Sequence, residues 1–348
     1  MKKILIVASV GSFVNSFLKE HVRLLQEFKY EVHFAANMKY EREGLYDELG
    51  LIVHHVEIQR GPFSSRNIIA YKQLKEIILR EGFSIVHCHT PIGGVLGRIA
   101  AYKTNVKKVI YLAHGFHFYK GCPLQNRLIY ENIEKLMARY TDVLITINQE
   151  DFKAASKFKL KERGKVFYIP GVGLDINKIQ SVKIDIKKKK DELNIKPDQV
   201  VVLSVGELNE NKNHSVILNA LSQVHNIDFV YLICGTGPFL SKLINLSKKL
   251  KITHKVKFLG YRKDVYEIYK IADVFCFPSK REGLGMAALE AMACGVPIIS
   301  SNVQGICDYS INGVTGFQYS PKDVAGFANG IQEIIENKSL RNRMKKMY

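Results

Sequence analysis

Short apolar runs alternate with amphipathic segments from one end of the chain to the other. The runs are apolar at consecutive positions rather than at every second one, which is typical of strands buried on both faces of a parallel sheet. Between the runs, apolar residues recur with the period of a helix. The predicted strands are residues 3–8, 32–36, 52–56, 85–88, 109–113, 143–147, 166–169, 200–205, 229–234, 256–259, 274–277 and 296–300. The predicted helices are residues 14–28, 66–80, 94–104, 126–140, 149–157, 213–224, 238–250, 285–294 and 323–336.

Two arrays of alternating strands and helices in series predict an α/β fold with two doubly wound domains. The polar stretch 177–199 lies between the arrays, and we therefore expect the domains to be residues 1–178 and 179–348. Its run of lysines, residues 187–190, is interpreted as a solvated linker or helix face. Ligands of such sheets bind beyond the carboxyl ends of the strands, so two facing domains would hold a ligand in the cleft between them.

The chain is strongly basic, with 51 lysines and arginines against 33 aspartates and glutamates, a formal net charge of +18. The excess is spread over both halves, so compositional background explains it as well as a binding surface does. As a binding surface it would suit nucleic acid, an anionic membrane or a phosphate-bearing substrate. Two basic amphipathic segments, residues 66–80 and 152–166, are interpreted either as membrane-contacting helices or as helices packed on the sheet.

The six cysteines are scattered without a C-x-x-C pair, which favours a reducing compartment. No apolar stretch reaches the ~18 residues that a membrane span requires. These features predict a cytoplasmic protein.

Residues 278–297 form the most informative segment, a predicted strand end followed by a glycine-containing turn and an alanine-rich helix. Gly283 and Gly285 would let backbone amides at the start of the helix approach an anionic ligand closely. Glu282 precedes the helix and Glu290 lies inside it, so the two carboxylates could contact different parts of one ligand. The alternative is that Glu282 only complements the helix N-terminus and that Glu290 is a surface residue.

From Glu282 onwards this segment reads E-G-L-G-x-x-x-x-E-A-M-A-x-G-x-P-I, which resembles the motif of retaining GT-B glycosyltransferases of family GT4. Two segments of the first half, 86–94 and 114–121, resemble the branch that builds bacterial capsular polysaccharides and exopolysaccharides. Further landmarks of the family occur in the expected order at residues 205–214, 234–238, 258–261, 272–274 and 312–317.

The resemblance implies a GT-B fold, in which two Rossmann-like domains face each other across a cleft. The first domain would bind the acceptor and the second the nucleotide-sugar. The implied reaction moves a hexosyl or N-acetylhexosaminyl residue, with retained configuration, from a nucleotide-sugar (UDP in preference to GDP) to a lipid-linked saccharide acceptor. The pathway would be bacterial capsular polysaccharide or exopolysaccharide synthesis, and such an enzyme would dock peripherally on the inner face of the cytoplasmic membrane.

By the same resemblance, the donor site would combine a cation, a glycine turn and two carboxylates. Lys212 would neutralise the donor phosphates, Glu290 would accept from the ribose hydroxyls, and Glu282 would bind the transferred sugar. The remaining donor-binding residues would be Gly11, Arg281, Gly283, Leu284 and Gly285. His114 would lie at the sugar and assist the acceptor or the leaving group, and His89 and His117 would contact the acceptor.

No cofactor is expected, and the chain contains no Asp-x-Asp, the usual carboxylate clamp for a metal-bound nucleotide-sugar. We therefore predict a metal-independent enzyme. A zinc site could be built from the histidines at 87, 89, 114 and 117 with Cys88 or Cys122, but it is disfavoured because no ligand pair has zinc-finger spacing. A nicotinamide enzyme is disfavoured because Gly11 is the only glycine in the first strand–helix turn.

Two features depart from the family pattern. Relatives commonly carry an arginine directly after the glycine of the 200–206 strand, as a second phosphate cation, and this chain has Glu207. Either Arg281 or Lys280 substitutes, or Glu207 points away, or the phosphates are held differently. Relatives also continue past the position of Tyr348 into a crossing helix, so we expect either that this helix is short here or that the chain is truncated.

These departures support an alternative, a non-catalytic basic protein on a degenerate GT-B scaffold that binds nucleic acid or a membrane. On the glycosyltransferase interpretation no nucleic-acid partner is expected. The expected partners are then a nucleotide-sugar donor, a lipid-linked saccharide acceptor and an anionic inner-membrane surface.

Overall fold

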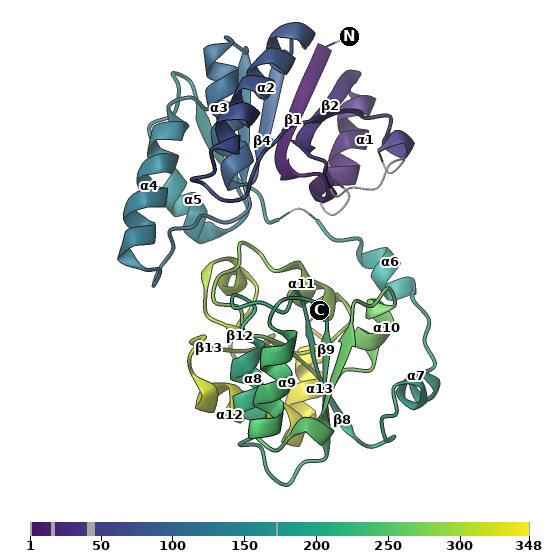
Figure 1. Cartoon of the computed structure of the whole chain (residues 1–348). Helices are drawn as coiled ribbons and strands as arrows, with labels where there is room; N and C mark the ends of the chain where they lie inside the picture. The colour runs from purple at the N-terminus through teal and green to yellow at the C-terminus, as the bar shows by residue number, and fades with distance from the viewer. Residues whose placement is uncertain (1, 15–17, 40–45, 172, 348) are drawn as a thin grey trace. The chain divides into compact units, whose positions relative to one another are not determined.

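The computed structural model describes residues 2–14, 18–39, 46–171 and 173–347. The chain forms two compact units, Met1–Val172 and Gly173–Tyr348, each built around a parallel sheet (Figure 1). The division falls a few residues before the boundary expected from the sequence. The prediction of two doubly wound α/β domains is confirmed.

The described part of the first unit contains a seven-stranded sheet of order β3-β2-β1-β4-β5-β6-β7, with every neighbouring pair parallel. Residues of α2, α3 and α5 pack on one face of this sheet and residues of α1 on the other. The strands are β1 (Lys2–Val10), β2 (Tyr30–Asn37), β3 (Ile52–His55), β4 (Ile85–His89), β5 (Lys108–Ala113), β6 (Val143–Thr146) and β7 (Lys165–Tyr168). The helices are α1 (Lys19–Glu27), η2 (Asp47–Leu49), α2 (Arg66–Glu81), α3 (Pro91–Lys103), α4 (Leu124–Ala138) and α5 (Gln149–Ala155).

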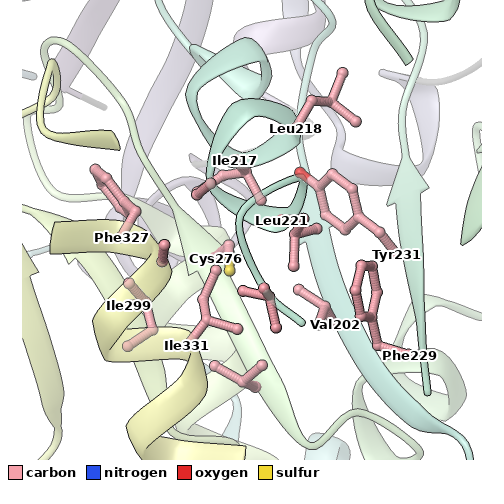
Figure 2. Packing of buried hydrophobic residues seen from close by; sticks show 14 of the residues in the cluster. Val202, Ile217, Leu218, Leu221, Phe229, Tyr231, Cys276, Ile299, Phe327 and Ile331 are labelled. Carbon is pink, nitrogen blue, oxygen red and sulfur yellow. The ribbon is translucent and has the colours of Figure 1, made fainter. Parts of the chain in front are cut away.

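The described part of the second unit contains a six-stranded parallel sheet of order β10-β9-β8-β11-β12-β13. One of its two apolar clusters packs α8 and α12 against the sheet through Val202, Leu218 and Phe327 (Figure 2). The strands are β8 (Val200–Val205), β9 (Phe229–Cys234), β10 (Val256–Gly260), β11 (Val274–Phe277), β12 (Ile298–Ser301) and β13 (Gly316–Tyr319). The helices are α6 (Ile176–Ser181), α7 (Ile186–Glu192), α8 (His214–Leu221), α9 (Leu240–Lys249), η3 (Thr253–Lys255), α10 (Val265–Lys270), α11 (Met286–Ala293), η4 (Gln304–Asp308), α12 (Val324–Glu336) and α13 (Lys338–Lys345).

The strand order of each unit reverses at one point. In the first unit the chain moves outwards from β1 to β3 and then crosses to β4 on the other side of β1. The second unit repeats this with β8 and β11. The loops that follow the two central strands diverge at such a point and leave a crevice where ligands bind.

The polar stretch 177–199 is more structured than the sequence predicted. It contains most of α6 and all of α7, and the side chains of Asp175 and Asp185 cap these helices by accepting from the amides of Lys178 and Lys188. Lys189 in the lysine run is buried rather than solvated.

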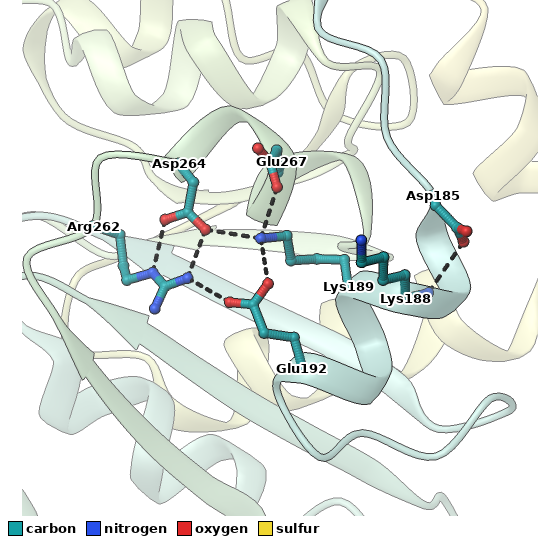
Figure 3. A network of polar contacts seen from close by, with 7 residues as sticks. All are labelled: Asp185, Lys188, Lys189, Glu192, Arg262, Asp264 and Glu267. Carbon is teal, nitrogen blue, oxygen red and sulfur yellow. Dashed lines mark hydrogen bonds and ion pairs between the residues drawn. The ribbon is translucent and has the colours of Figure 1, made fainter.

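Lys189 is held by three carboxylates, one on its own helix and two from the segment around α10 (Figure 3). Its Nζ lies 2.7 Å from Glu192, 2.9 Å from Asp264 and 2.6 Å from Glu267. Burial alone would lower the pKa of Lys189, but the hydrogen bonds that its ammonium donates to these carboxylates raise it above its usual value. Arg262, which also contacts Glu192 and Asp264, helps to hold the pKa of Asp264 at about 2. The network fixes α7 to the segment around α10 in the same unit.

In the described part of the chain, no helix combines the length and the apolar character needed to cross a membrane. No disulfide joins any of the six cysteines, all of which lie in the described part of the chain, and Cys88, Cys234 and Cys276 are buried.

Candidate active site

Two loops of the second unit are joined at the point where its strand order reverses. β8 and β11 are hydrogen-bonded neighbours, so the loops that follow them start side by side. The Asn211 side chain donates to the carbonyl of Arg281 at 2.9 Å, and the Lys280 amide donates to the carbonyl of Asn211 at 2.8 Å. Asn213 donates in the same way to the carbonyl of Pro278 at 3.1 Å. The two loops therefore form one structure, which positions the side chains they carry.

A cation and a carboxylate from these two loops form a short ion pair. The Nζ atom of Lys212 lies 2.6 Å from Oε2 of Glu282, and the two side chains are 22% and 18% exposed. The Lys212 amide donates to Oδ1 of Asn209, and its ammonium lies 5.0 Å from the ring centroid of Phe277. The pair thus lies at the carboxyl end of the sheet, partly shielded but reachable by a ligand.

The turn after Glu282 requires glycine. Gly285 has a φ of +94°, and a Cβ on it would lie 2.6 Å from the Phe277 ring and 2.7 Å from the Tyr309 hydroxyl. Gly285 is the N-cap of α11, and Gly283 and Leu284 before it are buried. Since the first amides of a helix have no partner within the helix, this turn directs donors and the positive end of the helix dipole towards an anion.

Glu290 lies one and a half turns into α11 and is half-buried. Its carboxylate is 3.4 Å from the Tyr266 hydroxyl and 3.3 Å from that of Tyr269, both on α10. Burial raises the pKa of Glu290, whereas the two tyrosine hydroxyls oppose that rise. The tyrosines hold the carboxylate in place, whereas an isolated surface glutamate would have no such partners.

Among the described residues, the Glu207 carboxylate is engaged by Asn209 and forms no hydrogen bond or ion pair with Lys212 or Glu282. The residue is exposed, and its carboxylate accepts from the Asn209 side chain at 2.9 Å. Of the two cations considered as replacements for the missing arginine, Lys280 is paired with Glu210 at 2.9 Å. The Arg281 side chain is half-buried and forms no ion pair with any described residue. Arg281 is therefore the cation that remains available to a ligand.

The first unit carries a strained residue at its own reversal point. Thr90, which follows β4, has a φ of +61° although it is not a glycine. Its Oγ1 accepts from the amide of Ser9 at 3.0 Å and lies 2.7 Å from the Ser9 hydroxyl. A Cβ on Gly93 would lie 2.8 Å from the same Oγ1. Such strain tends to persist where the surrounding structure enforces it, and functional sites are a common place.

Three histidines lie at this end of the first sheet, with His87 and His89 buried and His114 partly buried. Nδ1 of His89 is 3.1 Å from Nε2 of His114, and the ring centroid of His87 is 4.2 Å from that of His89. Phe13 packs edge-on against His114 with the ring centroids 4.9 Å apart. Burial lowers the pKa of His114 to about 4 and that of His87 to about 3, so both are neutral near pH 7.

The other candidates of the first unit are placed differently. Gly11 is buried after β1, and its amide donates to the carbonyl of Asn37 at 3.2 Å. His117 packs on Tyr130 of α4, with the ring centroids 5.0 Å apart. Within the described residues, no three histidine, cysteine, aspartate or glutamate side chains gather as a ligand set for a metal ion.

The structure therefore brings some of the candidates of each unit into contact, while Gly11 and His117 contact other residues. Lys212, Glu282 and the glycine turn are together in the second unit, and His89 and His114 are in contact in the first. Tyr266 and Tyr269 were not predicted as site residues, although their spacing of three on an amphipathic helix places them on one face. Asn211 and Asn213, whose side chains bind the 209–213 loop to the loop after β11, were not predicted either.

Two family models together match most of the chain. The model described as glycosyl transferase 4-like matches residues 3–148, and the model described as glycosyl transferases group 1 matches residues 185–347. EpsD of Bacillus subtilis (strain 168), which is named as a glycosyltransferase, is 33% identical over 350 residues, covering 99% of this chain and 90% of EpsD. The chain belongs to the group 1, GT4-like glycosyltransferases. The predicted family and the predicted glycosyltransferase activity are confirmed at this level.

An Escherichia coli relative is named UDP-Gal:alpha-D-GlcNAc-diphosphoundecaprenol alpha-1,3-galactosyltransferase. It is 32% identical over 292 residues, covering 80% of this chain and 75% of the relative. The crystal structure of Anabaena HepE in complex with UDP and glucose has a TM-score of 0.81 at 20% identity, covering 99% of this glycosyltransferase and 93% of HepE. This likeness confirms the GT-B fold.

Proposed function

We propose that this glycosyltransferase moves a hexosyl or N-acetylhexosaminyl residue from a UDP-sugar to a lipid-linked saccharide in bacterial capsular polysaccharide or exopolysaccharide synthesis. The observation that carries the proposal is the Lys212–Glu282 pair beside the N-terminus of α11. It offers a cation for a diphosphate and a carboxylate for sugar hydroxyls within one ligand's length. The names of the E. coli relative and of the HepE complex support UDP and a polyprenyl-diphosphate acceptor.

On the donor side, each group has a distinct task. Lys212 and Arg281 neutralise the diphosphate, and the amides of the turn at Gly283, Leu284 and Gly285 donate to its oxygens. Glu290, held by its two tyrosines, accepts from the ribose hydroxyls. Glu282 accepts from hydroxyls of the transferred sugar.

The proposed reaction retains the configuration of the sugar and needs no enzyme nucleophile. The bond between C1 and the phosphate oxygen breaks, and the acceptor hydroxyl oxygen bonds to C1 from the same face. The proton of that hydroxyl passes to the departing phosphate oxygen. Negative charge grows on the diphosphate as the bond breaks, and fixed cations and amides aimed at it lower the barrier.

On the acceptor side, the first unit supplies neutral hydrogen-bonding groups. His114, positioned by His89 and Phe13, is neutral near pH 7 and bonds hydroxyls at the reacting sugar or acceptor. His117 contacts the acceptor, the fully buried His89 acts on it through His114, and Gly11 lets a ligand approach the loop after β1 closely. We infer that the reaction is independent of metal ions and that the enzyme works at the cytoplasmic face of the membrane.

The test is transfer from a panel of UDP-sugars and GDP-sugars to a synthetic lipid-diphosphate saccharide, with and without EDTA. We expect a UDP-sugar to react, the product to retain its anomeric configuration by NMR, and EDTA to leave the rate unchanged. Lys212→Ala and Glu282→Gln should each lower turnover at least about 100-fold, the loss typical of a removed transition-state contact. Lys280→Ala is the matched control, because its ammonium is engaged with Glu210. An inverted product, or near-normal turnover in folded Lys212→Ala protein, would refute the proposal.

A further inference from the structure

The outer face of α4 is apolar although it is exposed. Its five large apolar side chains are between 36% and 71% exposed, whereas Glu134, Met137 and Ala138 on the opposite face are buried. Soluble helices normally place charged and polar residues on the solvent side. The exposed side chains, called the α4 ridge below, are Leu124, Leu128, Ile129, Ile133 and Leu136.

A buried ion pair fixes α4 in this orientation. Arg98 on α3 is fully buried, its guanidinium donates to Glu134 at 2.9 Å, and it stacks 3.8 Å from the ring centroid of Tyr111. Turning α4 to bury its ridge would leave Arg98 without its carboxylate in the interior, at a high cost in free energy. The α4 ridge is therefore a permanent surface feature.

A cationic pocket adjoins the ridge between α4 and α5. It has a volume of about 370 Å³ and contains Phe118, Phe158 and four cations. The two cations from α4, at positions 127 and 135, are both paired with Glu131. Lys153 and Lys157, by contrast, form no ion pair with any described carboxylate. Glu131 and Glu150 also line the pocket, so its four cations and two carboxylates leave a net charge of +2 beside exposed hydrocarbon.

We propose that the α4 ridge inserts into an anionic bilayer and that the pocket beside it binds a lipid phosphate. Exposed leucine and isoleucine next to a net positive charge is the combination that anionic membranes bind, through apolar insertion and headgroup attraction together. The inference rests on the proposed function, in which the acceptor is lipid-linked. It also agrees with the topology, since α4 starts after β5 and the 114–123 loop, at the same edge of the sheet as His114.

A second exposed apolar surface lies on α2 and the loop before it, and its chemistry differs. Its pocket contains Phe63, Ile68 and Tyr71 but no lysine or arginine. Ile69 next to Ile68 is 51% exposed. Lys72 and Lys75 on α2 are exposed as well, but no described cation lines the α2 pocket, so of the two surfaces the α4 ridge alone has a cationic pocket for a lipid phosphate beside it. The α2 surface therefore serves as the control.

The test is flotation of the full-length protein with vesicles of phosphatidylglycerol and phosphatidylethanolamine, compared with vesicles of phosphatidylcholine. Wild-type protein should bind the anionic vesicles, and less so as salt is raised. Leu128→Ser/Ile129→Ser should reduce partitioning at least about tenfold, because two inserted side chains are lost. Lys153→Gln/Lys157→Gln should reduce it about fivefold per lysine at low salt. The control Ile68→Ser/Ile69→Ser should bind as wild type.

UDP-induced thermal shifts, measured on the same proteins, separate this inference from the proposed function. Wild-type protein that shifts with UDP but does not float with anionic vesicles overturns the inference alone. If UDP produces no thermal shift in wild-type protein, the proposed function is contradicted, while the vesicle result still stands. If the α2 variant loses vesicle binding and the α4 variant keeps it, the protein docks through the α2 surface and the inference is overturned. A wild-type dimer that the α4 substitutions make monomeric, without vesicle binding, means that a second copy covers the ridge and also overturns it.

Discussion

Glu282→Gln should bind UDP more tightly than the wild type while transferring sugar far more slowly. In the structure, the Lys212 ammonium is engaged with the Glu282 carboxylate. On the proposed function, the donor diphosphate uses the same ammonium and must compete with that carboxylate. UDP carries no sugar, so it loses nothing when Glu282 becomes neutral and gains a Lys212 free of its internal partner.

The size of the effect follows from the geometry of the pair. Two unit charges 2.6 Å apart attract by about 6 kcal/mol at an effective dielectric constant of about 20. Hydration of the free charges offsets most of this, because both side chains remain partly exposed, and charged hydrogen bonds of this kind contribute about 1–2 kcal/mol net. Releasing Lys212 should therefore strengthen UDP binding about five- to thirtyfold. Turnover should still fall at least about 100-fold, since the contact to the transferred sugar is lost.

Calorimetric titration of UDP into the wild type and four variants tests this reasoning. Glu282→Gln should bind more tightly than wild type and Lys212→Met more weakly. The double variant should match Lys212→Met, because the carboxylate acts only through the lysine. Glu210→Gln, which alters an exposed carboxylate paired with Lys280, is the control and should leave the affinity unchanged. Weaker UDP binding by Glu282→Gln, or unchanged binding by Lys212→Met, would refute the assignment of Lys212 to the diphosphate.

Three further predictions concern backbone, buried charge and pH. Gly285→Ala should lower the free energy of unfolding by about 1–3 kcal/mol in urea titrations and abolish the UDP thermal shift, because the new Cβ strains the turn at φ +94°. Glu134→Gln should cost about 3–5 kcal/mol in the same titrations by leaving Arg98 buried and unpaired, and Arg98→Met added to it should restore part of that loss. The pKa of Asp264 is held at about 2, so its contribution to stability is complete above its unfolded pKa near ~4 and disappears as pH falls through about 2. Asp264→Asn should therefore destabilise the protein at pH 7 and flatten the acid limb of its stability profile; an unchanged limb would contradict the role of the Lys189 network.

The sheets could be predicted from the sequence because their strands are almost all continuous apolar runs, which few other structures produce. β13 escaped prediction because it is short and lies at the edge of its sheet, with only Gly316 of its four residues buried. Gly316 is needed there since a Cβ would lie 1.7 Å from the Ile298 carbonyl oxygen. The need for glycine at this position comes from the neighbouring strand β12, so the sequence around Gly316 gives no local pattern that predicts a strand.

The lysine run of α7 shows the same limit for helices. Four consecutive lysines favour a solvated segment by every local criterion, yet Lys189 is buried. Two of its three carboxylate partners, Asp264 and Glu267, lie more than seventy residues further along the chain. Local propensity could not reveal a helix whose burial depends on partners so distant.

For the site, the glycine turn and the two glutamates were visible because they lie within one short segment. The ion pair of Lys212 with Glu282 was not, since its members are 70 residues apart and meet only through the joined loops. The hydrogen-bond partner of Glu207 could not be predicted from the sequence either. A carboxylate in place of a cation indicated a lost phosphate contact, whereas the structure turns it towards Asn209 and leaves Arg281 without an ion pair among the described residues.

The two units place different electrostatics at equivalent points of the same topology. At the β8/β11 reversal the structure places charged groups, and the Lys212 side chain, although paired with Glu282, remains partly exposed to solvent and to a ligand. At the β1/β4 reversal, burial instead holds His114 and His87 neutral near pH 7. On the proposed function, a protonated imidazole at the acceptor would offer the departing diphosphate a further cation to bind. Neutral histidines bond hydroxyls without offering that charge, so the diphosphate is left to Lys212 and Arg281 on the donor side. On the proposed function, the contrast in burial thus assigns phosphate recognition to one unit and hydroxyl recognition to the other.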